Sequence, residues 1–100
     1  MEDFEKEVLN RIENGKKFSK KEMGDIIELF TVDSIREYSG KNNEITNIIS
    51  VVSLADRFFG IRCCYKNKGQ YTIKYEMPKE IYHCGYGWRF KDEERCYEVV

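Results

Sequence analysis

The residue types best suited to hold a metal ion gather in the last fifth of the chain: His83, Cys84, Asp92 and Cys96. Thiolate, imidazole and carboxylate are the groups that bind Zn²⁺ in four-coordinate protein sites. Gly85 and Gly87 follow Cys84, and they let the chain fold back so that backbone N–H groups point at the sulfur. A tail of this length buries little apolar surface, and small units of that kind are commonly closed by a metal. The sequence therefore predicts a structural zinc site in the tail.

Other roles for these side chains stay open. Cys63 or Cys64 could replace Asp92 as a ligand, since one of two adjacent strand residues must point inward. Without a metal, the two tail cysteines would be small buried apolar side chains, and His83 would be a surface imidazole.

Nucleophilic catalysis has one candidate, in which Cys63 or Cys64 acts with His83 as its base. Cys84 lies directly beside His83 in the sequence, which does not place the imidazole as an in-line base. The chain holds no phosphate-binding glycine loop, no His-Glu-x-x-His motif and no serine elbow. We therefore expect that the protein is not an enzyme.

Basic and aromatic residues concentrate in residues 57–91. This stretch holds eight bases and two acids, although the whole chain has 17 bases, 18 acids and a net charge of −1. It also holds nine of the 14 aromatic side chains. Interleaved bases and aromatics bind single-stranded nucleic acid, and the same residue types dominate protein interfaces. The candidate partner-binding residues are Arg57, Arg62, Lys66, Lys68, Lys74, Tyr86, Trp88 and Arg89.

The alternative for this stretch is a half-buried sheet, in which Tyr71 and Tyr75 fill a core and the lysines form a solvated face. Tyr86 and Trp88 flank a glycine turn, so we expect both to be exposed. The balanced total charge excludes a uniformly basic nucleic-acid binder and a polyanionic DNA mimic, although residues 92–94 could present a small acidic patch.

Membrane and secretory signals are absent from this sequence. No apolar run approaches the roughly 18 residues that a membrane helix needs. The first residues are acidic and lack the apolar stretch of a secretory signal. We expect a cytoplasmic protein without a membrane partner, whose four cysteines stay reduced.

Periodicity predicts two helices followed by strands. Residues 3–13 and 20–30 carry apolar side chains at helical spacing, and Ser19 and Glu22 form a capping-box pattern before the second helix. The predicted strands are residues 44–54, 57–65 and 70–76, with a turn at 66–69 and a tail hairpin at 81–100 around a charged turn.

The predicted fold class is α+β, with an N-terminal two-helix hairpin packed on a three-stranded antiparallel sheet and a C-terminal β-hairpin stapled by zinc. We expect a single domain over residues 1–100. Its expected parts are a helical part at 1–30, the sheet at 44–76 and the C-terminal hairpin at 80–100.

Two stretches resemble a known group of proteins. They are Val-Leu-Asn-Arg-Ile-Glu-Asn-Gly-Lys-Lys-Phe-Ser-Lys-Lys-Glu at residues 8–22, and residues 49–61 with their Asp-Arg-Phe-Phe, closing at Met-Pro-Lys-Glu-Ile in residues 77–81. Both are similar to stretches of small accessory proteins of phages and integrative elements in Gram-positive bacteria. Some proteins of that kind are type II-A anti-CRISPR inhibitors of the RNA-guided effector nuclease. The resemblance covers residues 8–81.

This resemblance implies a protein that binds the type II CRISPR effector nuclease non-covalently and blocks target DNA recognition in the bacterial host cytoplasm. We expect a monomer or weak dimer. Two other functions remain open: a nucleic-acid-binding accessory protein of a phage or mobile element, and a zinc-stapled protein-interaction module.

Overall fold

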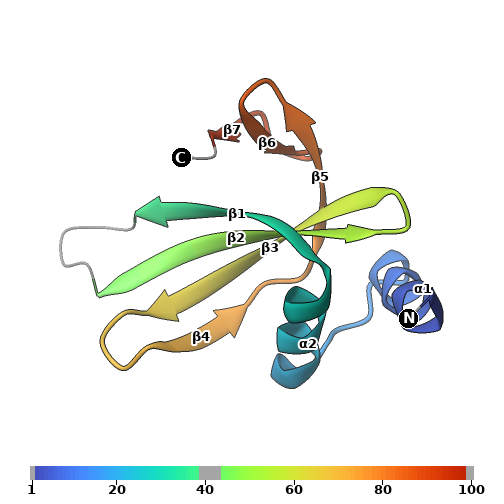
Figure 1. The fold of residues 1–100 in the computed structure, drawn as a ribbon, viewed down its shortest axis with the longest axis horizontal. Coiled ribbons are helices and arrows are strands. Elements are labelled where there is room, and N and C mark those ends of the chain that lie inside the picture. Colours follow the sequence, from blue (N-terminus) through green and yellow to red (C-terminus); the bar gives the residue numbers. More distant parts are fainter. Residues whose placement is uncertain (1, 39–43, 99–100) are drawn as a thin grey trace.

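Within residues 2–38 and 44–98, which the computed structural model describes, the chain forms two helices and seven strands (Figure 1). The helices are α1 (Glu2–Glu13) and α2 (Lys20–Phe30). The strands are β1 (Thr31–Tyr38), β2 (Ile45–Leu54), β3 (Arg57–Lys66), β4 (Tyr71–Tyr75), β5 (Lys79–Cys84), β6 (Gly87–Phe90) and β7 (Cys96–Glu98). All strand pairs are antiparallel, in the order β1-β2-β3-β5-β6-β7, and β4 pairs with β3 off this path.

Local sequence signals explain both helices. The predicted capping box opens α2: the Glu22 backbone N–H donates to Ser19 Oγ at 3.1 Å, and the Ser19 N–H donates to Glu22 Oε1 at 2.8 Å. Met23 and Ile26 form the buried face of α2, and Val8 is the buried residue of α1. Both predicted helices are confirmed at their positions. No helix among the described residues is long and apolar enough to cross a membrane.

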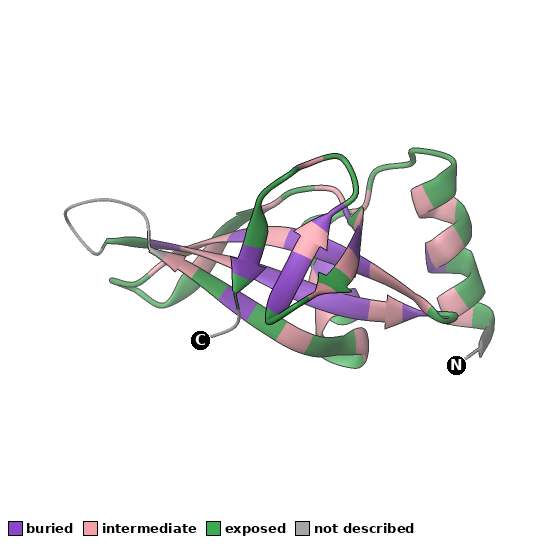
Figure 2. Cartoon of the chain, turned by 90° about the horizontal axis from the view of Figure 1, so that it is seen from above, coloured by how far each residue is buried: buried purple, intermediate pink, exposed green. Residues whose placement is uncertain are grey.

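The helices cross each other, so the predicted helical hairpin is wrong. Figure 1 shows α1 nearly along its axis and α2 from the side, whereas Figure 2 shows α1 from the side. They meet through the Phe4 and Phe30 rings, whose centroids lie 6.0 Å apart, and through an ion pair between Arg11 and Glu22. Val8 of α1 and Met23 and Ile26 of α2 pack into one core with residues of β2 and β3.

The predicted three-stranded sheet is only the middle of the sheet that forms. β2, β3 and β4 are the predicted strands, but β1 extends the sheet on one side and β5 to β7 continue it on the other. β1 is a mostly polar edge strand in which Ile35 is buried. Thr31 is the C-cap of α2 and also the first residue of β1. Sequence reasoning missed it because no turn residue separates the helix from the strand. The predicted fold class is therefore wrong, and most of the described chain is sheet.

β3 changes its partner along its length, and this turns the C-terminal part over the sheet. Its C-terminal half pairs with β4, with Cys64 opposite Lys74, and its first half pairs with β5, with Phe59 opposite Glu80. Pro78 separates β4 from β5 and has no N–H to donate to a ladder. From there the chain curls away from the plane of β1 to β3 (Figure 1). The charged turn predicted in the tail does join two paired strands, β6 and β7. The prediction of a separate hairpin at residues 80–100 is wrong, since β5 pairs with β3 and the described residues 80–98 continue the sheet; residues 99–100 lie outside the described residues.

Two cores lie on the two faces of β2 and β3, whose buried residues Figure 2 shows in the centre of the molecule. The helix-side core contains Val8, Met23, Ile26, Val52, Leu54, Phe59, Ile61 and Cys63. The second core, under β5 to β7, contains Ile35, Ile49, Val51, Ile81, Trp88, Phe90 and Tyr97. Alternate residues of β2 therefore serve different cores, which explains why this strand is apolar on both faces.

The C-terminal strands approach the sheet closely at Gly60. A Cβ atom at this position would lie 2.7 Å from Cε1 of Phe90 and 3.1 Å from Cδ1 of Ile81. The Phe90 ring is fully buried above this glycine. Gly60 therefore provides the space that lets the second core close.

Candidate functional site

Of the predicted zinc ligands, the structure brings Cys84 and Cys96 together. Cys84 ends β5 and Cys96 begins β7, and their Sγ atoms lie 2.6 Å apart. The ring of His83 instead packs edge-on against Trp88, with the ring centroids 5.1 Å apart. Adjacent strand residues face opposite sides of a sheet, so His83 and Cys84 diverge.

The remaining ligand and its possible substitutes lie elsewhere. Asp92 forms an ion pair with Lys79, with an N–O distance of 3.4 Å. Cys63 belongs to the helix-side core, where burial raises the pKa of its thiol to about 11 although Ser50 Oγ lies 3.9 Å from the sulfur. Across residues 2–38 and 44–98, no three His, Cys, Asp or Glu side chains converge on a point that could hold a metal. The four predicted ligands thus do not form one site.

The two predicted contact aromatics have opposite environments. Tyr86, in the turn between β5 and β6, is 90% exposed, as expected. Trp88 is 6% exposed, and its Nε1 donates a hydrogen bond to Asp33 Oδ2 at 2.9 Å. Phe58 packs on its ring, with the centroids 5.1 Å apart. The expectation of an exposed Trp88 is wrong, because the indole completes the second core.

Arg57, a predicted contact residue, joins three parts of the fold. Its guanidinium pairs with Glu80 of β5, with an N–O distance of 3.2 Å, and also with Glu13 at the end of α1. The hydrogen bond with Arg57 holds the pKa of the Glu80 carboxyl below its ordinary value. Arg57 thus serves as a link between α1, β3 and β5.

Arg62, a second predicted contact residue, holds the C-terminal strands against β3. Its Nη2 donates to Glu93 Oε2 at 2.8 Å and to Tyr97 Oη at 2.8 Å, and its guanidinium carbon lies 4.4 Å from the Phe90 ring centroid. Burial lowers the pKa of Arg62, but the hydrogen bonds to Glu93 and Tyr97 outweigh this and raise it above the ordinary value. Arg62 is therefore charged and already paired.

Arg89, the third predicted contact arginine, stacks on an aromatic ring. Its guanidinium carbon lies 5.3 Å from the ring centroid of Tyr82. Its buried Nε has no hydrogen-bond partner among the described residues. The half-buried side chain thus covers Tyr82 more than it presents a free charge.

The acidic turn after β6 offers little free negative charge. Asp92 pairs with Lys79, and Glu93 pairs with Arg62. In the part of the chain that the structure describes, only Glu94 of these three acids has no ion-pair partner. The turn therefore does not form the small acidic patch that residues 92–94 suggested.

The predicted contact lysines lie on the hairpin formed by β3 and β4. Lys66 ends β3, Lys68 lies in the turn and Lys74 lies in β4. None of the three pairs with an acid among the described residues. Gly69, with φ of 105°, and Gln70, with φ of 56°, reverse the chain in left-handed conformations. The predicted turn is confirmed.

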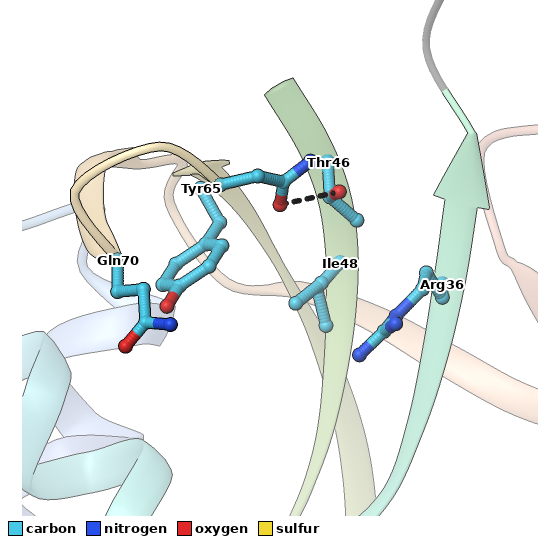
Figure 3. Close-up of a pocket in the computed structure, with 6 residues that line it drawn as sticks. Arg36, Thr46, Ile48, Tyr65 and Gln70 are labelled. Atoms are coloured by element: carbon cyan, nitrogen blue, oxygen red, sulfur yellow. Dashed lines mark hydrogen bonds between the residues drawn. The ribbon is translucent and has the colours of Figure 1, made fainter. Parts of the chain in front are cut away.

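A surface pocket of about 400 Å³ lies beside this hairpin (Figure 3). It is lined by Arg36, Thr46, Ile48, Tyr65, Asn67 and Gln70. Figure 3 shows the Tyr65 ring next to the Gln70 side chain, with Arg36 across from them and Ile48 between. Thr46 Oγ1 donates a hydrogen bond to Asn67 Oδ1 at 2.9 Å, which holds the turn against β2. The pocket thus combines a cation, an aromatic ring and amide groups.

A second pocket of about 210 Å³ lies where α2 meets β4, lined by Phe18, Lys20, Met23, Ile73, Lys74 and Tyr75. Lys20 and Lys74 both border it, and no carboxylate lines this pocket or the one beside the hairpin. Cations that gather without a counter-ion favour an anionic partner. We name Lys20, Arg36, Lys66, Lys68 and Lys74 the basic surface.

Sequence reasoning missed two members of the basic surface. Arg36 lies in β1, which was not predicted as a strand, and Lys20 stood only at the start of the predicted second helix. The alternation of Ser34 and Arg36 around the buried Ile35 is the signal that could have placed Arg36 on a sheet face.

Comparison of this chain with protein-family models, with curated proteins and with solved structures found no match.

Proposed function

We propose that this protein inhibits the type II-A CRISPR effector nuclease by non-covalent binding in the bacterial cytoplasm, without catalysis. The observation that carries the proposal is the basic surface, whose five cations have no ion-pair partner among the described residues. A guide-loaded effector holds RNA and takes up DNA, so phosphates border its protein surface. The basic surface is complementary to that border. The resemblance of residues 8–81 supplies the class of partner.

Apolar side chains beside the cations add specificity to this contact. Tyr71 is 50% exposed and Ile73 is 41% exposed, and both lie on the same hairpin as Lys74. Tyrosine is frequent among the residues that dominate binding energy, whereas charge mainly speeds encounter. Binding of this hairpin to the phosphate-bordered surface of the effector would compete with target DNA for that surface.

Direct binding of nucleic acid is the second candidate, and the same lysines favour it. Tyr65 and Tyr71 lie next to them and could stack on unpaired bases. The two functions differ in their response to salt, because binding to phosphates weakens steeply as counterions are added. They also differ in whether the effector protein is needed. An inhibitor acts only on the effector, whereas a nucleic-acid-binding protein binds free DNA or RNA without it.

The test is a titration of the purified protein into guide-loaded type II-A effector, with target DNA binding and cleavage read together. We expect both to fall in parallel at a stoichiometric ratio, because the block precedes DNA recognition. Unchanged binding and cleavage across several effector orthologues would overturn the proposal. Tight, salt-sensitive binding to free DNA or RNA in the same samples would establish the second candidate instead.

A charge-reversal pair of variants locates the contact. The variant Lys66→Glu, Lys68→Glu, Lys74→Glu should lose inhibition by at least about tenfold, since three favourable contacts become repulsive. The matched control reverses Lys6, Lys16 and Lys17, which lie on α1 and the following loop and also lack ion pairs among the described residues. Equal loss in the control would show that net charge matters and the hairpin does not.

A further inference from the structure

Cys84 and Cys96 form a pair of thiols that the proposed function does not use. β6 separates their strands in the sheet order, yet their Sγ atoms lie 2.6 Å apart. Cys96 is exposed and Cys84 is half-buried, so a reagent in solution reaches the pair. Cys63 and Cys64 have no thiol contact of this kind among the described residues. We propose that Cys84 and Cys96 are a modification site that forms a reversible disulfide with a small-molecule disulfide as oxidant.

The spacing of the sulfurs fits a covalent bond better than a shared metal ion. Two thiolates on one tetrahedral Zn²⁺, each at about 2.3 Å, lie roughly 3.8 Å apart. The observed separation of Cys84 and Cys96 is shorter by more than an ångström. A bond of about 2.0 Å needs a smaller adjustment, which the exposed end of β7 can supply.

A pocket gives the oxidant access to Cys96. This surface pocket of about 420 Å³ is lined by Ile35, Arg36, Glu37, Arg95, Cys96, Tyr97 and Glu98. Of the charged side chains at this pocket, Arg95 pairs with Glu37, with an N–O distance of 3.7 Å. Cys96 is exposed and Cys84 is half-buried, so Cys96 is the first thiol that the oxidant meets.

The exchange proceeds in two balanced steps. The Cys96 thiolate attacks one sulfur of the small-molecule disulfide, breaks its S–S bond and releases one thiolate, which takes up the proton that Cys96 lost. The Cys84 thiolate then attacks the Cys96 sulfur of the mixed disulfide and releases the second thiolate, which takes up the proton of Cys84. In total, the two protein thiols lose two electrons and become one disulfide. The small-molecule disulfide gains these two electrons and becomes two thiols.

The bond would hold the C-terminal layer over the sheet. It closes a loop around β6, which carries Trp88 and Phe90 of the second core. Cross-linking removes conformations from the unfolded chain, so the oxidised protein should melt roughly 10 °C above the reduced protein. The proposal does not depend on the partner of the basic surface.

The test incubates the full chain with oxidised glutathione and measures the intact mass and the cysteine-containing peptides under non-reducing conditions. We expect a loss of about 2 Da, a Cys84–Cys96 cross-linked peptide and full reversal by dithiothreitol. Cys84→Ser should stop at one glutathione on Cys96. The control Cys64→Ser should still form the bond.

Two outcomes would overturn the proposal. In one, both tail cysteines stay open to alkylation after exposure to oxidised glutathione. In the other, each carries its own glutathione and no bond closes. Both outcomes are read on the unmutated protein, so the test holds even where Cys84→Ser fails to fold.

Discussion

Trp88 of β6 donates a hydrogen bond from its Nε1 to Oδ2 of Asp33 on β1, at 2.9 Å, although the two residues are 55 positions apart. β1 and β6 are not neighbours in the sheet order. The bond therefore crosses the second core and connects the edge of the sheet with the layer that lies over it. It also satisfies the one polar atom of a buried indole.

The first prediction concerns this bond. Trp88→Phe keeps an aromatic ring in the core but removes the N–H that donates to the Asp33 carboxylate. The free energy of unfolding should therefore fall by about 1–3 kcal/mol. Urea unfolding measures the change. Tyr86→Phe, at a position that is 90% exposed, should change it by less than about 0.5 kcal/mol. Equal effects of the two substitutions would contradict the buried position of Trp88.

The second prediction concerns the close approach of Phe90 to Gly60. Gly60→Ala places a Cβ atom 2.7 Å from the Phe90 ring. This overpacking should lower the free energy of unfolding by about 1–3 kcal/mol, and by less in a Phe90→Leu background. A double-mutant cycle by urea unfolding measures the coupling.

A matched glycine on α2 provides the control for Gly60. The Cβ of Gly24→Ala would meet no atom closer than Tyr75 Oη, at 3.8 Å. Alanine is the better helix former, so this variant should gain about 0.5–1 kcal/mol. A neutral Gly60→Ala would show that the C-terminal strands lie further from β3 than described.

The third prediction is a pH dependence that arises from Glu22. Its hydrogen bond with Arg11, together with the Ser19 backbone N–H, lowers the pKa of the Glu22 carboxyl from 4.5 to about 2. A carboxyl whose pKa is lower in the folded state stabilises the protein above the unfolded-state value. That stability should be lost as the pH falls from about 4.5 towards 2.

The variant Glu22→Gln tests this window, because glutamine keeps a capping oxygen but has no charge to lose. The unfolding midpoint of the unmutated protein should fall more steeply below about pH 4.5 than that of Glu22→Gln. Glu28→Gln, on the exposed face of the same helix, should follow the unmutated protein. Parallel profiles for Glu22→Gln and the unmutated protein would show that the Arg11 pair does not act in solution.

The fourth prediction concerns zinc. Because only Cys84 and Cys96 of the four predicted ligands converge, we expect a chelator to leave the Tm of the reduced protein unchanged. Elemental analysis of the purified protein provides the second readout. One zinc per chain, together with a drop in Tm on chelation that Cys96→Ser reproduces, would restore the metal interpretation of the tail.

Much of the fold was encoded in short-range patterns and could be predicted. Ser19 and Glu22 are three positions apart, so the capping box that begins α2 is visible in the sequence. The apolar run of β2, the strand residues of β3 and the turn at residues 66–69 likewise depend on neighbours in the chain. These features follow from backbone preferences and local hydrogen bonds, which depend on residues close together in the sequence.

The candidate sites were less predictable, because residue types reveal chemistry but not which side chains meet. The tail showed two thiols, an imidazole and the carboxylate of Asp92 within fourteen positions, and this suggested one metal site. Because adjacent strand residues face opposite sides, His83 packs against Trp88 instead of pointing toward Cys84. Asp92 forms an ion pair with Lys79. In the same way, the cations of residues 57–91 looked alike in the sequence, yet Arg57 and Arg62 are paired inside the fold.

By itself, the sequence determined the helices, the central strands and the inventory of charges and thiols. The tertiary structure alone decided that β3 changes partners, that the tail lies over the sheet and that Cys84 meets Cys96. It also decided which lysines stay unpaired on the basic surface. The physical reason is that strand pairing and core closure depend on contacts between residues far apart in the sequence. Which of these contacts form is decided by the burial of both faces of β2 and β3 at once.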